Sequence, residues 1–306
     1  MGRPDPSMIV DREGDLAAFA TMLTLDSPQR VMVVSDRRGR GKTDLLRKLR
    51  HQCEWRNPPV SAALFDFEAR GVTTDIEIVE CLAEQLRDAA GGLELANYER
   101  LSQARLIGDV GKFAQEWSVM SGSINLTSAQ LSGEAQAAGI INNIHIEHVA
   151  SMTTPEWNEA LDKHARRLCK EAFFSDLLEA TRESPVVLIF DTVNSADQDM
   201  RRWLVNELLR RRLLANWQEH HLLLILAGTD VDQLLEPLVA MSEGARLLPA
   251  SPLHEWGPDE VRAFLAAHGI DGFVDKEVES IQNVIAAGLS LVKALQIAEL
   301  MKEPTP

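Results

Sequence analysis

The chain of 306 residues is 45% hydrophobic and 25% charged, a composition typical of a globular protein with a sizeable core. Its net charge of −15, from 31 basic and 46 acidic residues, argues against non-specific attraction to nucleic acid, and its three distant cysteines lack the spacing of a disulfide framework. No secretory leader is evident, and the apolar runs are far shorter than the about 20 residues of a membrane span. We therefore expect a cytoplasmic protein without membrane contact.

The first elements predicted along the chain alternate between strand and helix. Residues Val31–Ser35 form a short apolar, β-branched run that is typical of a strand buried on both faces. After a glycine-rich turn, leucines at helical spacing predict a helix over Thr43–Cys53. A second strand is predicted over Val60–Phe67, and a second helix over Asp75–Ala90.

The middle of the chain, about Leu101–Met152, differs in character. It is rich in Ser, Gly, Asn and Gln, and two stretches, Ser123–Thr127 and Asn143–Glu147, alternate strictly between polar and apolar residues. Such alternation is typical of half-exposed hairpins. We predict an insertion with short antiparallel strands here, with disorder as the alternative.

Helices and strands alternate again after Pro155. The predicted helices are Glu156–Glu183, Asp197–Trp217 and Asp230–Met241. The predicted strands are Val186–Asp191, Leu222–Ala227 and a short fifth strand, Arg246–Pro249. Strands that alternate with helices indicate an α/β fold with a parallel sheet.

Three helical patterns close the chain and predict a small all-α appendage. They cover Pro258–His268, Asp275–Ala287 and Ser290–Lys302. We accordingly expect an α/β core over residues 1–250, with the insertion at about 101–152, and a helical appendage over residues 251–306.

The turn after the first strand matches a phosphate-binding loop. Such a loop requires a strand, a glycine-rich turn, a lysine, and a serine or threonine that opens a helix, and Gly39, Gly41, Lys42 and Thr43 follow this order. Glycines allow backbone N–H groups to face phosphate oxygens, and the helix N-terminus adds positive charge. We expect Lys42 to reach the β- and γ-phosphates of ATP, and Thr43 to ligate Mg²⁺.

The loop departs from the full pattern at Asp36, where the first glycine is expected. Aspartate tolerates a left-handed backbone better than most residues, but its carboxylate is unfavourable near phosphates unless it points away or nearby arginines offset it. The residues that we expect to bind ATP in this loop are Arg38, Gly39, Arg40, Gly41, Lys42, Thr43 and Asp44.

A second acidic element follows the strand Val186–Phe190. Asp191 stands where P-loop proteins hold Mg²⁺ through water. The next residue is Thr192, which cannot act as a base near neutral pH, and Asn194 can orient a water but cannot take its proton. Thr229 follows the strand Leu222–Ala227, which we place between the other two, and is our candidate for sensing the γ-phosphate. Hydrolysis is therefore less well supported than binding.

The ordered motifs resemble the AAA+ and STAND class of signal-transduction ATPases. The motifs are IVDREGDLAAFATML, SDRRGRGKTDLL, VVLIFDTVNSAD followed by RRWLVNELL, LLLILAGTD, SPLHEWGPDEVRAFLAAHGI and AAGLSLVKALQIAEL. The resemblance implies an αβα P-loop core with a five-stranded parallel sheet in the order 5-1-4-3-2, a helical lid, and oligomerisation. It also implies that Arg12 lies near the adenine. The family often has an acidic residue where Asn194 stands and an arginine where Thr229 stands.

The resemblance implies an ATP-binding switch that controls a separately encoded effector, as in bacterial defence systems. One alternative is a nucleic-acid-handling ATPase of the origin-recognition or transposition-helper kind, which the acidic charge disfavours. Another is a degenerate scaffold that binds no nucleotide. Arg246 is a candidate arginine finger across a subunit interface, with a surface salt bridge as the alternative, and Lys293 is either a lid sensor or a solvated lysine.

Overall fold

The structure is a computed structural model of the whole chain. It describes residues 13–36, 41–71, 74–108, 112–113, 116–117, 159–215, 217–239, 247–249, 257–267, 269–270, 272–286 and 291–302. The chain forms two compact units, one of residues 1–93 with 181–306 and one of residues 94–180. Each unit is described by itself below.

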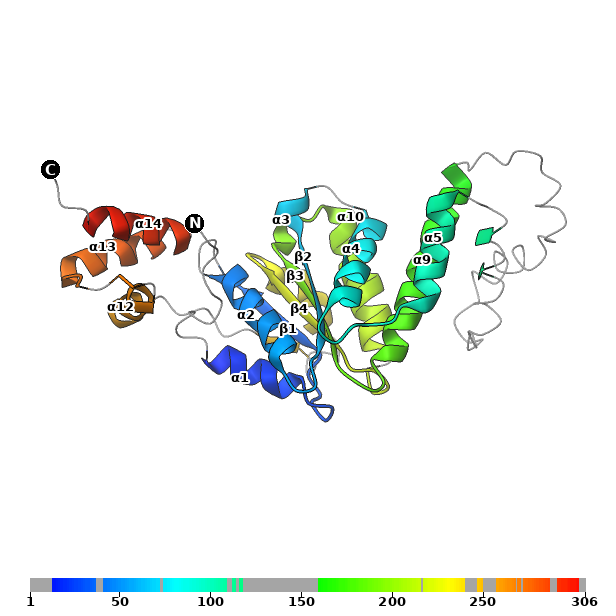
Figure 1. Cartoon of the computed structure of the whole chain (residues 1–306), viewed down its shortest axis with the longest axis horizontal. Coiled ribbons are helices and arrows are strands. Elements are labelled where there is room, and N and C mark those ends of the chain that lie inside the picture. Colours follow the sequence, from blue (N-terminus) through cyan, green and yellow to red (C-terminus); the bar gives the residue numbers. More distant parts are fainter. Residues whose placement is uncertain are drawn as a thin grey trace. The chain divides into compact units, whose positions relative to one another are not determined.

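A parallel sheet forms the centre of the first unit (Figure 1). Its strands are β1 (Val31–Ser35), β2 (Ser61–Asp66), β3 (Val186–Asp191), β4 (Leu222–Gly228) and β5 (Leu247–Pro249). They lie in the order β2-β3-β4-β1-β5, and every neighbouring pair is parallel. The predicted α/β class with a parallel sheet is confirmed. The four longer strands follow the predicted order 1-4-3-2, and β5 adds a three-residue edge beside β1.

The strand register brings polar residues together at one edge of the sheet. Ser35 pairs with Gly228, and Asp66 pairs with Asp191. Each of these residues ends its strand. Because the strands are parallel, all four ends lie at the carboxyl edge, where ligands bind in open α/β sheets.

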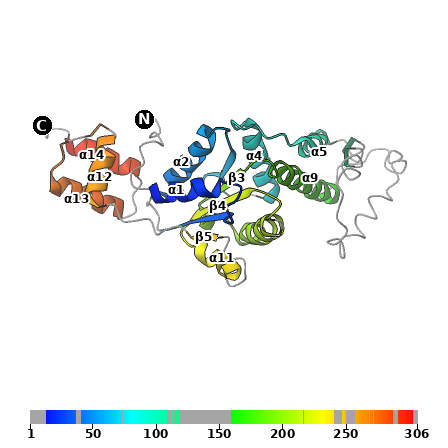
Figure 2. The ribbon, with the colours of Figure 1, turned by 90° about the horizontal axis from the view of Figure 1, so that it is seen from below.

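In the first unit, α1 (Glu13–Met22) precedes β1, and further helical segments lie between successive strands. These segments are α2 (Lys42–Trp55), α3 (Phe67–Arg70), α4 (Asp75–Asp88), the 3-10 turn η2 (Val193–Ser195), α10 (Gln198–Trp203), η3 (Leu204–Leu214) and α11 (Val231–Val239). The segment η3 continues α10 as a π-helix, in which the Ala215 N–H donates to the carbonyl of Arg210. Figure 2 shows α2 and α11 on opposite sides of the sheet.

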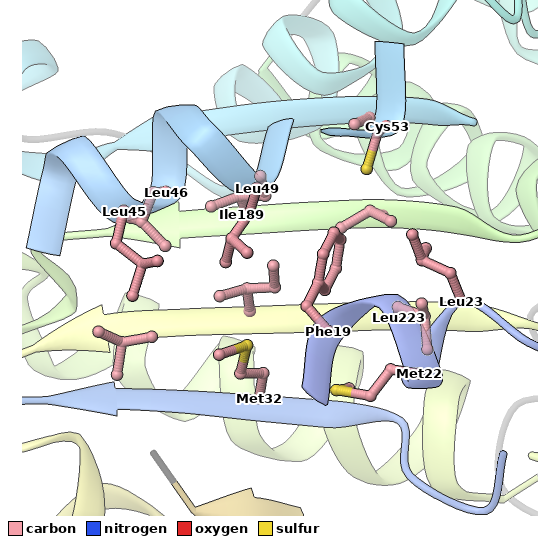
Figure 3. Packing of buried hydrophobic residues seen from close by; sticks show 14 of the residues in the cluster. Phe19, Met22, Leu23, Met32, Leu45, Leu46, Leu49, Cys53, Ile189 and Leu223 are labelled. Atoms are coloured by element: carbon pink, nitrogen blue, oxygen red, sulfur yellow. The ribbon is translucent and has the colours of Figure 1, made fainter. Parts of the chain in front are cut away.

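Apolar side chains of α1 and α2 fill one side of the sheet (Figure 3). Phe19 and Met22 come from α1, and the contributing residues of α2 are Leu45, Leu46, Leu49 and Cys53. Every residue of β3 and β4 is buried, which explains their continuous apolar sequences. The core therefore fixes the position of α2 against the sheet.

In the described part of the second unit, α5 (Ala96–Ile107) and α9 (Glu159–Ala180) pack on each other. The predicted insertion of short strands from Leu101 onward is wrong at its start, because residues 101–107 belong to α5. Leu101 and Ala104 are buried in this unit, and such burial stabilises a helix whose own sequence has little amphipathic pattern. The alternating stretches Ser123–Thr127 and Asn143–Glu147 lie outside the described residues.

Three helices, α12 (Pro258–Ala267), α13 (Asp275–Ala286) and α14 (Leu291–Lys302), follow the predicted pattern near the end of the chain. They share a small core of their own, in which Val261, Phe264 and Ile281 are buried. Across the described ranges of the whole chain, no helix has the length and hydropathy of a membrane span.

Candidate functional site

The start of α2 is built for an anion. Gly41 precedes the helix with φ 78°, a left-handed conformation that favours glycine, and no side chain among the described residues caps the first-turn N–H groups there. These donors and the positive end of the helix dipole lie at the carboxyl edge of the sheet. Arg38, Gly39 and Arg40 lie outside the described residues.

Lys42 forms a hydrogen bond with Asp36, the residue that follows β1. Its Nζ donates a hydrogen bond to the backbone carbonyl of Asp36 at 2.5 Å. Burial lowers the pKa of Lys42, while the negative charges of Asp36 and Asp191 raise it. Asp36 itself does not use a left-handed backbone, since Thr192 is the one non-glycine residue with positive φ in the described part of the chain. Glycine is therefore not required at this position.

Thr43 and Asp191 meet directly. The Thr43 hydroxyl donates to Oδ2 of Asp191 at 2.7 Å, and the Thr192 N–H donates to Oδ1 at 2.8 Å. Asp191 is 1% exposed, and burial raises the pKa of its carboxyl. The Thr43 bond lowers this pKa, and the negative charge of Asp66 raises it. A buried carboxylate in this setting favours a cation beside it.

Thr192 follows Asp191 in a strained conformation. Its φ of 54° is left-handed, which is unusual for a β-branched residue. Strain of this kind costs about 1–3 kcal/mol and persists where surrounding contacts fix the backbone. The turn after β3 is therefore held in place at the expense of local stability.

Asn194 and Thr229 lie together at the ends of β3 and β4. Oδ1 of Asn194 accepts the Thr229 backbone N–H at 3.1 Å. The Thr229 hydroxyl lies 3.3 Å from Oδ2 of Asp230 and donates to it, and the Thr229 carbonyl accepts the Ser35 hydroxyl at 3.3 Å. The structure thus brings both residues to the site, but their polar groups contact neighbouring protein groups.

The structure shows less about the other residues predicted for the site. Asp44, in the first turn of α2, pairs with Arg47 at 2.9 Å, and burial raises the pKa of its carboxyl while Arg47 lowers it. Arg12 and Arg246 lie outside the described residues. Lys293 belongs to α14, but its side chain is outside the described part of the structure.

Three residues of the site were missed by the sequence analysis: Ser35, Asp66 and Arg201. Asp66 ends β2 beside Asp191, and its Oδ1 accepts the first N–H groups of α3. An acidic residue that interrupts the apolar run of β2 is the signal that marks it. Arg201 bonds only to backbone carbonyls among its described contacts, and such a role leaves no sequence pattern.

The assembled groups fit a magnesium–phosphate ligand. Lys42 and the uncapped N-terminus of α2 supply positive charge, while Thr43 and Asp191 supply oxygens at one point. Within the described ranges, no group of three or more His, Cys, Asp and Glu residues is arranged to hold a metal by itself. Mg²⁺ commonly takes one or two protein oxygens and completes its shell with water and phosphate.

No protein-family model matches the chain, and no curated protein matches it either. Eight chains of solved structures match it, among them three of 13–15% identity. A Walker-type ATPase of Pyrococcus abyssi is 15% identical, with a TM-score of 0.48, and the match covers 98% of this chain and 75% of that chain.

The other two matches cover a smaller share of the solved structure. Cdc6p of Pyrobaculum aerophilum is 13% identical, with a TM-score of 0.45, over 97% of this chain and 62% of that one. The Orc1 protein of Aeropyrum pernix, solved in complex with DNA, is 13% identical, with a TM-score of 0.49, over 98% of this chain and 65% of that one. The chain thus spans less than two thirds of these two proteins, and identities this low transfer no function.

Proposed function

We propose that this protein binds Mg-ATP at the loop before α2 and acts as a nucleotide-dependent switch of the AAA+ kind. The observation that carries the proposal is the contact of Thr43 with Asp191, beside Lys42 and the uncapped start of α2. Lys42 and the first N–H groups of α2 hold the phosphates, and Thr43 and Asp191 hold Mg²⁺, Asp191 through water. Bound Mg²⁺ supplies positive charge that stabilises the phosphate oxygens.

The electrostatics of Lys42 and Asp191 support this assignment. Burial lowers the pKa of Lys42 and raises the pKa of Asp191, so the protein places each charge where water stabilises it poorly. An anionic phosphate compensates the lysine, and a cation compensates the carboxylate. A ligand that carries both charges therefore stabilises the site.

Hydrolysis is proposed to be slow. Thr192 stands next to Asp191 and is no base near neutral pH, and the side-chain Oδ1 of Asn194 already accepts the Thr229 N–H. Asp66 is a second carboxylate beside Asp191, but its Oδ1 caps α3. A steady rate of many ATP molecules per second from the isolated protein contradicts this part of the proposal.

Binding is tested by calorimetry on Lys42→Ala. We expect the variant to lose measurable Mg-ATP binding, because the lysine is the one described cation of the loop that reaches the site. Its melting temperature without nucleotide should stay near that of the wild type. Lys276→Ala, on the exposed surface of α13, is the matched control and should bind normally. Binding by Lys42→Ala as tight as that of the wild type overturns the proposal.

Two more specific functions of such a switch are proposed as alternatives. One is control of a separate effector by an ATP-dependent change of conformation or assembly, in which α12–α14 act as a lid. The other is nucleic-acid handling, as in an ATPase of the origin-recognition or transposition-helper kind; the similar Orc1 protein was solved in complex with DNA. The net charge of −15 limits any such binding to a local surface.

DNA binding separates the two alternatives. Fluorescence anisotropy with duplex DNA, measured with and without Mg-ATP at two salt concentrations, should show salt-dependent binding if the protein handles nucleic acid. Mass photometry with and without Mg-ATP reports whether copies assemble. Assembly without DNA binding favours the effector switch, and DNA binding favours the alternative.

A further inference from the structure

The turns that follow β3 and β4 are in close contact through Asn194. Its Oδ1 accepts the Thr229 N–H at 3.1 Å. The approach depends on Gly228, because a Cβ at this position would lie 3.0 Å from Asn194 Oδ1 and from Val231 Cγ2. Both the amide and the glycine are therefore needed for this arrangement.

Arg201 fixes Asn194 from the other side. Its Nη2 donates to the backbone carbonyl of Asn194, and its Nε donates to the carbonyl of Ala196 at 3.0 Å. Asp197 caps the helix that carries Arg201, because its Oδ1 accepts the Met200 N–H at 2.8 Å. The turn η2 is thus anchored to the start of α10.

The same contacts form a ring around the site. Thr43 contacts Asp191, and the strained Thr192 leads from Asp191 to η2 and Asn194. Asn194 contacts Thr229, and the Thr229 carbonyl accepts from Ser35.

The ring closes through the phosphate loop. The Asp36 N–H donates to the carbonyl of Gly228 at 3.1 Å, and Lys42 donates to the carbonyl of Asp36. The groups proposed to bind Mg-ATP, on Lys42, Thr43 and Asp191, are all members of this ring.

We infer that Asn194 is a positioning residue that couples Asp191 to the β4 turn and to α11. The inference rests on the proposed nucleotide site and deepens it. When Lys42 and Thr43 engage a ligand, the ring opens at their contacts with Asp36 and Asp191. Asn194 then remains as the link between the two turns and carries the change at Asp191 to Thr229, two residues before α11 begins.

This role differs from the orientation of a water by Asn194. Coupling needs only the oxygen that accepts the Thr229 N–H, and a carboxylate can provide it. Asn194→Asp should therefore keep the link, while Asn194→Ala removes it. Asn206→Ala, an exposed asparagine of η3, is the matched control.

The first measurement needs no ligand. Residue-resolved hydrogen exchange should show the Thr229 amide exchanging about tenfold faster in Asn194→Ala than in the wild type, as expected for the loss of one hydrogen bond. Asn194→Asp and Asn206→Ala should exchange like the wild type. Equal Thr229 exchange in the wild type and Asn194→Ala overturns the inference.

The second measurement adds Mg-ATP. In the wild type we expect slower exchange over residues 41–46 and over residues 229–236, and in Asn194→Ala only over the first segment. Slower exchange of both segments in Asn194→Ala overturns the coupling but leaves the proposed function intact. If neither segment changes in the wild type, the proposed function fails and the coupling fails with it.

A second variant covers the case in which Asn194→Ala does not fold. Gly228→Ala places a methyl group against Asn194 Oδ1 and disturbs the same contact from the β4 side. It should reproduce the pattern of Asn194→Ala in both measurements. Wild-type exchange at Thr229 together with wild-type protection of residues 229–236 in a folded Gly228→Ala protein contradicts the inference.

Discussion

The hydroxyl of Thr43 donates a hydrogen bond to Oδ2 of Asp191 at 2.7 Å, across 148 positions of sequence. One group opens α2 and the other ends β3, so the contact exists only because β4 places β1 and β3 two strands apart with their carboxyl ends aligned. It joins the two oxygens that we propose to hold Mg²⁺, Asp191 through water, and it leaves the carboxylate of Asp191 buried with two hydrogen bonds.

Removing the charge of Asp191 should stabilise the protein. Burial raises the pKa of this carboxyl, so the native state holds the proton more tightly than the unfolded state does. The free energy of unfolding then falls as the pH rises from about 4 through the native pKa, and the penalty is fully present above it. Asp191→Asn should therefore melt at a higher temperature at pH 7 in the absence of nucleotide.

The matched control for this change is Asp199→Asn, whose side chain is 84% exposed. It should leave the melting temperature unchanged, while Asp191→Asn alone should weaken Mg-ATP binding in calorimetry. A lower melting temperature for Asp191→Asn at pH 7 shows that the hydrogen bonds of the carboxylate outweigh its burial.

Thr192→Gly should also stabilise the protein. The left-handed conformation costs a β-branched residue about 1–2 kcal/mol, and glycine removes this cost. The more flexible unfolded chain of the glycine variant offsets about 0.5–1 kcal/mol of the gain. We expect a net gain of about 0.5–1 kcal/mol in urea unfolding. Ser195→Gly, three residues later in a turn with ordinary backbone angles, should lose stability. Equal losses in both variants would show that Thr192 is not strained.

His221 should make stability depend on pH. The residue is 3% exposed, and burial lowers its pKa, with a bond to the Met22 carbonyl opposing and Arg30 and Arg56 adding to the effect. The unfolded state therefore takes up a proton first, so the free energy of unfolding is highest above about pH 6.5 and falls as the pH drops towards the native pKa.

The measurement is thermal unfolding between pH 5 and 8 for the wild type and His221→Gln. The variant should show a shallower dependence on pH, because glutamine keeps a polar group near Met22 but does not titrate. Burial also lowers the pKa of His164, so part of the slope should remain until that histidine is changed too. An unchanged slope in His221→Gln rejects the assignment.

Asp176 should be essential to the pairing of α5 and α9. Its carboxylate accepts the N–H groups of Asn97 and Tyr98, both at 2.9 Å, and the side-chain amide of Asn97 at 2.6 Å. Asp176→Ala leaves these donors unpaired, and we expect a loss of about 2–3 kcal/mol in the free energy of unfolding. Hydrogen exchange should locate the loss in α5 and α9. The exposed Glu179→Ala on α9 is the control and should change stability little.

The sequence predicted the α/β class because the signals are local. Buried strands such as Val186–Asp191 are continuous apolar runs, and α4 begins where Thr74 and Glu77 form a capping box. The order strand, glycine turn, Lys42 and Thr43 likewise lies within one segment, so the candidate phosphate loop could be found without the fold.

Tertiary structure decided what depends on distant contacts. Helix α5 is stable because Leu101 and Ala104 are buried where it packs on α9, which begins more than fifty residues later, and its own sequence has little amphipathic pattern. The role of Asn194 was not predictable, because its partner is a backbone N–H of another strand end. A backbone donor has no residue type, so only the packing of β3 beside β4 could assign that asparagine to Thr229.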